Sequence, residues 1–213
     1  MAVAFDSSTL APAVKTLVDA LAPEHRGSSE VFVKYAAALA RFGAHTDLVG
    51  AKTPAALAEI ALADALVLAR NAALCVSPGW EIGAGGASLS VPLALMVPGF
   101  SGRLVEPRQK RATFLRLAIG TLGLASRLSI DQVRVDLAHP PHDVAGCAFG
   151  RAVFAPDAWL PLAATVVKPG GAFAVLTTSD LSVATGYDVL ASDRYTLPFA
   201  RVERVITWLR AIR

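Results

Sequence analysis

Apolar residues in the first third of the chain recur at the three- and four-residue spacing of amphipathic helices. This spacing predicts helices over residues 7–24, 30–42 and 54–70. No internal repeat or low-complexity linker separates these helices from the rest of the chain. We therefore expect residues 1–72 to form a helical cap packed on a core domain of residues 73–213.

From residue 79 onward, short apolar runs alternate with helical patterns. Strands are expected in a run ending at Glu81 and over residues 103–105, 132–137, 146–149, 172–177 and 202–209. Helices are expected over residues 89–96, 108–125 and 157–166, and a further helical region before the last strand. This alternation predicts an α/β, Rossmann-like fold with a mostly parallel sheet, which binds ligands at the carboxyl ends of its strands.

The first predicted strand leads directly into a glycine-rich turn. Gly83, Ala84 and Gly85 follow Glu81 closely, and such a turn lets bare backbone approach a ligand. Glu106 ends the next strand, about 20 residues further on, where nucleotide-binding folds place a carboxylate on ribose hydroxyls. The two features together predict a nucleotide site, and a tight turn beside two solvent-exposed glutamates is the alternative.

The composition is apolar, with 54% hydrophobic residues, 17% charged residues and a mean hydropathy of +0.50. No membrane-spanning helix is expected, however. The most apolar stretch, residues 55–76, is interrupted by Glu59, Asp64 and Arg70. No basic segment precedes an apolar run at the N-terminus, which argues against a signal peptide and favours a cytoplasmic protein.

The net charge of +3 and the pI of about 9.1 permit a nucleic-acid partner without requiring one. Basic residues gather in two places, which are Arg103, Arg108, Lys110, Arg111 and Arg116, and then Arg201, Arg204, Arg210 and Arg213. Each group is either a surface for RNA phosphates or a solvated face.

Two motifs carry a family resemblance. Residues 81–93 read EIGAGGASLSVPL, and residues 104–115 read LVEPRQKRATFL. Shorter matches are Asp47-Leu48, Asp64, Arg151-Ala152 and Glu203-Arg204. The turn Lys168-Pro169-Gly170-Gly171 before the fifth strand resembles one that class-I methyltransferases often use at this place. Over about residues 30–210 the chain resembles the GidB family, the bacterial guanine N7-methyltransferases of small-subunit (16S) ribosomal RNA.

The chain also departs from the family pattern at several polar positions. In the first motif, Ala87 replaces the third glycine and Leu89-Ser90 replaces a Pro-Gly pair. Elsewhere, Ala61 stands in place of a histidine, Gly146 in place of an aspartate, and Thr177-Thr178 in place of a Lys-Gly pair. Several of the missing groups are expected to face the substrate. A diverged relative that methylates another substrate is therefore an alternative.

The resemblance implies a class-I methyltransferase fold with an antiparallel last strand, and S-adenosyl-L-methionine as the cofactor. The cofactor-binding residues that it implies are Glu81, Gly83, Ala84, Gly85, Glu106, Pro107 and Asp136. Asp143 is an alternative to Asp136 beside the adenine. Arg151, Lys110 and Arg111 are the candidates for contact with ribosomal RNA or the small ribosomal subunit, and a salt bridge or a solvated position is the alternative for each.

No catalytic acid or base is expected, because guanine N7 already carries an in-plane lone pair and proximity can supply most of the rate. No metal is expected either, since His139 and His142 lack a third ligand and Cys75 and Cys147 are isolated. Two other functions remain open. One is a non-catalytic module that binds cofactor or RNA, and the other is a nicotinamide oxidoreductase, for which the sequence shows no Tyr/Lys or His/Asp arrangement.

Overall fold

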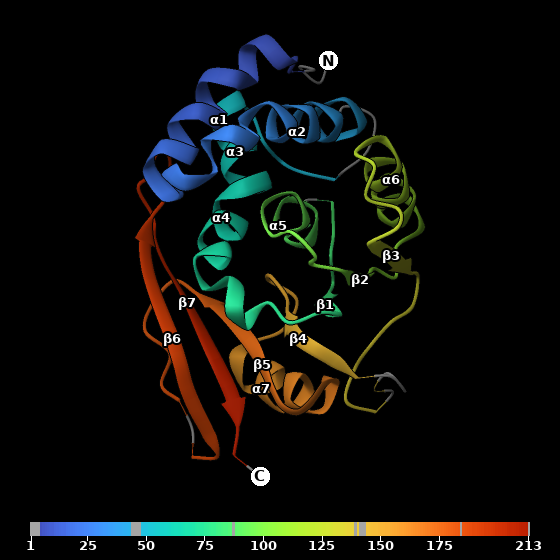
Figure 1. The fold of residues 1–213 in the computed structure, drawn as a ribbon, viewed down its shortest axis with the longest axis vertical. Coiled ribbons are helices and arrows are strands. Elements are labelled where there is room, and N and C mark those ends of the chain that lie inside the picture. The colour runs from blue at the N-terminus through green and yellow to red at the C-terminus, as the bar shows by residue number, and fades with distance from the viewer. Residues whose placement is uncertain are drawn as a thin grey trace.

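The chain folds around one seven-stranded sheet (Figure 1). The computed structural model describes residues 5–43, 48–86, 88–138, 140, 144–183 and 185–212. The strands are β1 (Gly79–Ile82), β2 (Gly102–Val105), β3 (Leu128–Asp131), β4 (Ala145–Phe149), β5 (Val167–Thr177), β6 (Tyr187–Thr196) and β7 (Glu203–Ala211). They lie in the order β3-β2-β1-β4-β5-β7-β6. β7 runs antiparallel to both neighbours, whereas the other described pairs are parallel. This order confirms the predicted Rossmann-like class-I methyltransferase fold.

Alternate residues of the central strands point to opposite faces of the sheet and enter two hydrophobic cores. In β5, Ala172 and Ala174 join the core on the side of the N-terminal helices, whereas Phe173 and Val175 join the core on the other face. The helices that follow β1, β2 and β4 are α5 (Ser90–Met96), α6 (Gln109–Thr121) and α7 (Pro156–Val166). α7 packs on the second face, opposite α5 (Figure 1). Burial on both faces explains why these strands read as nearly continuous apolar runs.

The N-terminal helices share one hydrophobic core with the sheet. They are α1 (Ser7–Leu21), η1 (Pro23–Ser28), α2 (Ser29–Gly43) and a third helical stretch made of α3 (Pro54–Ala58), η2 (Glu59–Ala63), α4 (Asp64–Leu68) and η3 (Ala69–Leu74). Asp6 caps α1 by accepting the Thr9 N–H at 2.9 Å, and Thr53 caps α3 in the same way. The three predicted helices are confirmed. None of the helices described is long and apolar enough to cross a bilayer.

The third strand was predicted in the wrong place. We expected it over residues 132–137 because Val133, Val135 and Leu137 alternate, but the structure has it at 128–131, paired in parallel with β2. Of the three alternating residues Val135 is buried, while Val133 and Leu137 are 51% and 53% exposed. The alternation therefore belongs to an extended segment with one buried side chain and not to a strand of the sheet.

The segment before the last strand is a strand and not the helical region that we expected. β6 lies at the edge of the sheet and pairs with β7. It carries Asp188, Asp193 and Arg194 and has no continuous apolar run. Edge strands are commonly charged because charges discourage pairing with another chain. That composition hid the strand from a hydrophobic-pattern analysis.

Candidate functional site

The glycine turn after β1 is held against the end of β2. Gly83 and Gly85 have φ values of +70° and +64°, which glycine adopts without steric cost. The N–H groups of Gly83 and Ala84 both donate to the Val105 carbonyl, at 2.8 and 3.0 Å. A Cβ on Gly83 would lie 2.3 Å from Cγ2 of Val153. The turn therefore requires glycine at position 83 for conformation and for space.

Glu106 connects the second strand to the same turn. It is buried directly after β2, and its Oε2 accepts the Gly85 N–H at 2.8 Å. Its Oε1 accepts the Arg108 N–H at 2.8 Å. Each carboxylate oxygen has two lone pairs, so each can accept one further hydrogen bond. The structure thus brings together the predicted turn and the predicted acid.

Glu81 is buried at the end of β1 and caps the start of α5. Its carboxylate accepts hydrogen bonds from the Ser88 hydroxyl and from the N–H groups of Leu89 and Ser90, the last two at 2.7 and 2.8 Å. Burial raises the pKa of Glu81, and these hydrogen bonds oppose part of that shift. The Tyr35 hydroxyl accepts the Ser88 N–H at 3.0 Å. Glu81 therefore holds the junction of turn and helix, a role that we did not predict.

A cavity of about 330 Å³, called here the smaller cavity, lies beside the turn. The predicted site residues that line it are Glu81, Gly83, Ala84, Gly85, Arg111 and Arg151. Four other predicted residues are not part of this lining. Glu106 contacts the turn through Gly85, Pro107 and Lys110 are exposed, and Asp136 accepts the Ala138 N–H at 3.0 Å.

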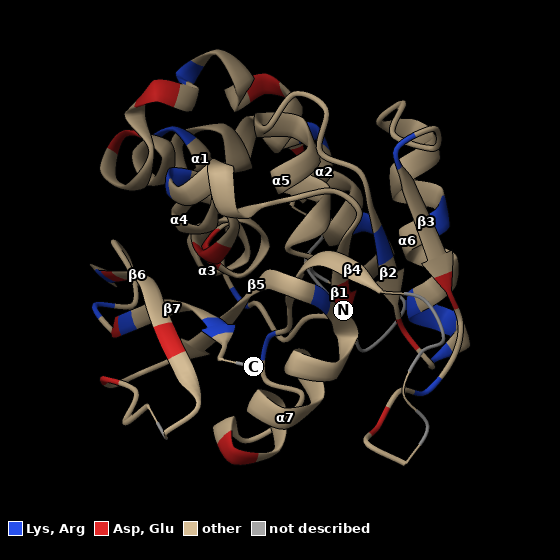
Figure 2. Cartoon of the chain, turned by 60° about the horizontal axis from the view of Figure 1, so that its bottom comes forward, with Lys and Arg blue, Asp and Glu red and all other residues tan. Residues whose placement is uncertain are grey.

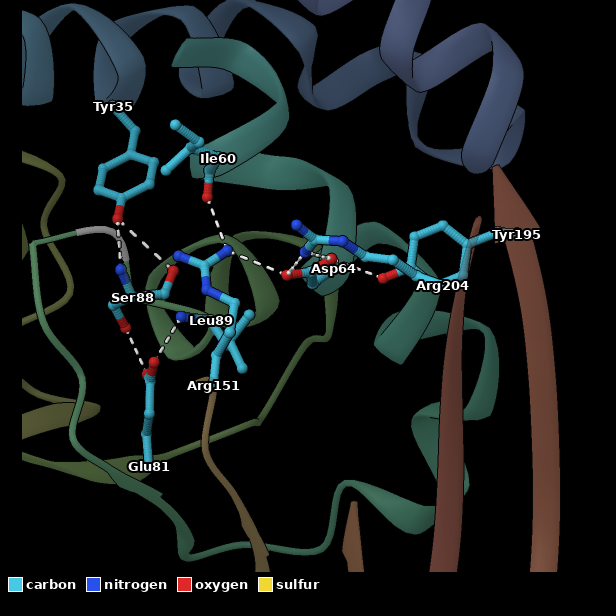
Figure 3. Close-up of polar contacts among 9 residues, drawn as sticks. All are labelled: Tyr35, Ile60, Asp64, Glu81, Ser88, Leu89, Arg151, Tyr195 and Arg204. Atoms are coloured by element: carbon cyan, nitrogen blue, oxygen red, sulfur yellow. Dashed lines mark hydrogen bonds and ion pairs between the residues drawn. The ribbon is translucent and has the colours of Figure 1, made fainter. Parts of the chain in front are cut away.

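Arg151 lies between two groups of polar contacts (Figure 3). On one side are Glu81, Ser88 and Tyr35, and on the other side is Asp64. Its Nη1 donates to the Ile60 carbonyl at 2.8 Å and to Oδ2 of Asp64 at 3.0 Å. Ile60 belongs to the π-helical turn η2, and such turns often occur at functional sites because they displace the regular helical hydrogen bonds.

Asp64 is fully buried and anchors three side chains from distant parts of the chain. Besides Arg151, it contacts Arg204 of β7, whose Nη1 lies 2.8 Å from each carboxylate oxygen, and it accepts the Tyr195 hydroxyl of β6 at 2.5 Å. Burial alone would raise the pKa of Asp64. The charges of Arg151 and Arg204 and the hydrogen bond from Tyr195 outweigh it, so the pKa lies below its ordinary value.

A second cavity of about 750 Å³, the larger cavity, adjoins the first. Both are lined by Ile60, Arg151 and Ala152. The polar residues of the larger cavity are Glu59, Arg151, Arg204, Thr177, Thr178 and Ser179. It lies between η2, the end of β5 and the turn from β6 to β7, which is the carboxyl edge where the fold predicts ligands.

Several residues of this region were not singled out as site residues from the sequence. Glu59, Tyr195 and Arg204 contribute to the larger cavity or to the Asp64 contacts. The available signal was the presence of Glu59 and Asp64 in an otherwise apolar helical stretch, because buried charges need partners.

Other predicted positions, which are Asp47, Ala87, His139, His142 and Asp143, lie outside the described residues. Within the described ranges, no group of three His, Cys, Asp or Glu residues is placed to hold a metal ion. Cys75 and Cys147 are free and buried.

Basic residues gather where α6 begins (Figure 2). Arg108, Lys110 and Arg111 have no ion-pair partner in the part of the chain that the structure describes. Cations at a helix N-terminus oppose the helix dipole. Arg111 nevertheless points to the smaller cavity, where its Nη1 would lie 3.9 Å from a Cβ built on Gly85.

The fold has counterparts among solved structures. A SAM-dependent methyltransferase from Geobacter sulfurreducens, crystallised with S-adenosyl-L-homocysteine, matches with a TM-score of 0.53 and 13% identity. The match covers 68% of this chain and 90% of that one. At this identity the similarity shows the fold alone.

Sequence comparison gives a narrower result. A protein named ribosomal RNA small subunit methyltransferase G from Rhizorhabdus wittichii is 39% identical over 85 residues, which is 39% of this chain but 37% of that protein. A protein of the same name from Anaeromyxobacter dehalogenans is 26% identical over 200 residues, covering 88% and 91% of the two chains. The family model described as "GidB: rRNA small subunit methyltransferase G" matches residues 28–183. Residues 28–183 make up well over half of the chain, and the chain therefore belongs to the GidB family.

Proposed function

We propose that the chain transfers the methyl group of S-adenosyl-L-methionine to RNA, with guanine N7 of small-subunit (16S) ribosomal RNA as the acceptor. Membership of the GidB family supports this activity. The observation that carries the proposal is the hydrogen bond of 2.8 Å between Glu106 and the Gly85 N–H. It joins a glycine turn and an acid at the carboxyl ends of two adjacent strands, as a nucleoside-binding site requires.

The residues around the turn fit the proposed cofactor. Gly83, Ala84 and Gly85 line the smaller cavity, so the backbone of the turn can contact a ligand there. Glu106 has lone pairs left for the ribose hydroxyls. The guanidinium of Arg111 can pair with the carboxylate of the cofactor. S-adenosyl-L-methionine supplies an electrophilic methyl group on a sulfonium. Pro107 and Asp136 remain predicted contacts.

The chain's contribution to the reaction is proposed to be placement of the acceptor. Guanine N7 has an in-plane lone pair, so the attack on the methyl group needs no general base. Effective molarities of oriented groups reach about 10⁵ M or more, which is enough for proximity to supply most of the rate. Arg151 lies on the wall that both cavities share and is the proposed contact between protein and acceptor.

The wider setting of the activity is also proposed. The partner is the ribosomal RNA or the small ribosomal subunit, and the compartment is the cytoplasm. Residues 1–72 act as a helical cap on the cofactor-binding domain of residues 73–213. Arg108 and Lys110 are exposed at the start of α6 and suit contacts with RNA phosphates.

Methyl transfer from labelled cofactor to unmethylated small ribosomal subunits tests the proposal. We expect label in the RNA with the wild-type chain. Glu106→Gln should raise the Kd of S-adenosyl-L-methionine about tenfold or more, because charge-assisted hydrogen bonds contribute about 1.5–3 kcal/mol. Asp157→Asn, an exposed change on α7, should leave this Kd unchanged.

Three results, from this assay and from binding measurements, would contradict the proposal. Label in small molecules but in no RNA would indicate a diverged relative with another substrate. Cofactor binding without transfer to any acceptor would indicate a non-catalytic module. Thermal stabilisation by NAD, and none by S-adenosyl-L-homocysteine, would indicate a nicotinamide enzyme.

Arg111 and Lys110 are neighbours on α6 with different expected roles. Arg111 lines the smaller cavity, whereas Lys110 is exposed. Arg111→Gln should raise the Kd of S-adenosyl-L-methionine about tenfold, because it removes a charge-assisted bond to the cofactor carboxylate. Lys110→Gln should leave that Kd within twofold and raise the KM for RNA. Isothermal titration with the cofactor checks both variants, and equal cofactor affinities would contradict the assignment of Arg111.

A further inference from the structure

The larger cavity holds a buried carboxylate that the methyl-donor site does not use. Glu59 is 6% exposed and lines this cavity from η2. Its Oε1 accepts the Phe199 N–H at 2.6 Å and the Ala200 N–H at 3.2 Å. Its Oε2 also accepts the Ala200 N–H, at 3.2 Å, and keeps one lone pair. No lysine, arginine or histidine of the described ranges forms an ion pair with it. Buried carboxylates are normally paired with a cation, so this one suits a ligand that brings its own hydrogen-bond donors.

The same cavity presents hydrogen-bond donors from a different direction. Arg204 uses Nη1 on Asp64, and a guanidinium has five N–H donors in all. Arg151 lines the cavity as well, on the wall shared with the smaller cavity. A ligand in this cavity therefore meets an acceptor group at Glu59 and donor groups at the two arginines.

We propose that the larger cavity binds the acceptor guanine, with Glu59 as the residue that selects guanine. This inference rests on the proposed methyl transfer. Guanine presents the N1–H and 2-amino donors next to the O6 acceptor. Oε2 of Glu59, which has a lone pair left, accepts a hydrogen bond from the 2-amino group, and the arginines donate to O6. Adenine lacks this order of donors and acceptor.

This orientation leaves N7 available for methylation. In guanine, O6 lies between N1 and N7, so a base whose N1 edge meets Glu59 turns its N7 edge away from that carboxylate. The N7 edge then faces the side of the larger cavity at Ile60, Arg151 and Ala152, where this cavity adjoins the smaller one in which the methyl donor is proposed to bind. The volume of about 750 Å³ falls within the roughly 300–1,000 Å³ typical of small-ligand sites. The base must be unstacked from the RNA to enter.

Calorimetry with GMP and IMP in saturating S-adenosyl-L-homocysteine tests the inference. IMP differs from GMP by the missing 2-amino group. The wild-type chain should bind GMP about tenfold more tightly than IMP, as expected for one charge-assisted hydrogen bond. Glu59→Gln should bind the two nucleotides within twofold of each other, because the amide presents a donor in place of one carboxylate oxygen. Glu203→Gln, an exposed change at the start of β7, should keep the tenfold preference.

Ala56→Phe gives an independent test if Glu59→Gln fails to fold. Ala56 lines the larger cavity and takes no part in the side-chain contacts of Glu59 or Asp64. Phenylalanine there should weaken GMP binding at least tenfold and leave the Kd of S-adenosyl-L-homocysteine within twofold. Equal preference for GMP in wild type and Glu59→Gln, or unchanged GMP binding in Ala56→Phe, overturns the inference. GMP selectivity in a chain that transfers no methyl group would refute the methyl transfer while supporting the assignment of this cavity.

Discussion

Replacing Asp64 with asparagine is expected to destabilise the folded chain by about 3 kcal/mol. Asp64 is fully buried and contacts Arg151, Arg204 and Tyr195. The variant keeps the size of the side chain but removes the charge that compensates both guanidinium groups. Breaking a buried pair usually costs about 3–5 kcal/mol. We expect the lower end because the two arginine side chains retain 22% and 34% of their exposure and are partly screened by water.

Urea denaturation measures this effect, and Asp188→Asn is its control. Asp188 also pairs with an arginine of β7, Arg210, at 3.0 Å, but both side chains are 45% exposed. Exposed pairs contribute about 0–1 kcal/mol. A loss for Asp64→Asn no larger than that for Asp188→Asn would show that the buried contacts do not stabilise the fold.

The acid limb of the stability curve should also change. The pKa of Asp64 in the folded chain lies below its ordinary value of 3.8, so the unfolded chain binds more protons in this range. Stability from Asp64 is therefore present above pH 3.8 and is lost as the pH falls through the lowered pKa. Asp64→Asn should lose less stability than wild type over this window. The comparison cancels other titrating groups, such as Glu81, that both chains share.

The glycine turn and Glu106 could be predicted because their constraints are local. A turn with positive φ at Gly83 and Gly85 needs glycine, and the sequence displays it. The position of the acid then follows, because one helix and one strand of ordinary length separate it from the glycine turn. The different roles of two adjacent residues on α6 were harder to predict. Arg111 and Lys110 carry the same charge, and the hydrophobic pattern of the helix does not say which of them reaches the cavity.

The Asp64 contacts could not be predicted because they join residues far apart in the sequence. Arg151, Tyr195 and Arg204 lie 87, 131 and 140 positions away from Asp64. Glu59 reaches Phe199 across 140 positions in the same way. The contacts of Tyr195, Arg204 and Phe199 depend on how the β6–β7 hairpin folds back over the third helical stretch, and β6 itself was not predicted. Two acidic residues in an otherwise apolar helix indicate that buried partners exist, but the sequence does not show which residues these partners are.

Gly83→Ala is expected to destabilise the chain by about 2–5 kcal/mol and to weaken binding of S-adenosyl-L-methionine at least tenfold. Gly83 has a φ of +70°, where an L-residue costs about 1–2 kcal/mol. The new Cβ would also lie 2.3 Å from Cγ2 of Val153, and such overpacking costs about 1–3 kcal/mol. A shift of the turn that relieves either effect would move Gly85 relative to Glu106, so the same change should reach the proposed cofactor site.

A second substitution separates the two causes of this loss. Adding Val153→Ala to Gly83→Ala should recover most of the part caused by the overlap, because only Cβ of residue 153 would remain close, at 3.2 Å, and should leave the part caused by φ. Gly120→Ala is the matched control, since a Cβ there would meet nothing within 4 Å. In that helical setting alanine should stabilise the chain by about 0.5–1 kcal/mol. Wild-type melting and wild-type cofactor affinity in Gly83→Ala would show that the turn is not constrained as described, and the cofactor site proposed beside it would lose its support.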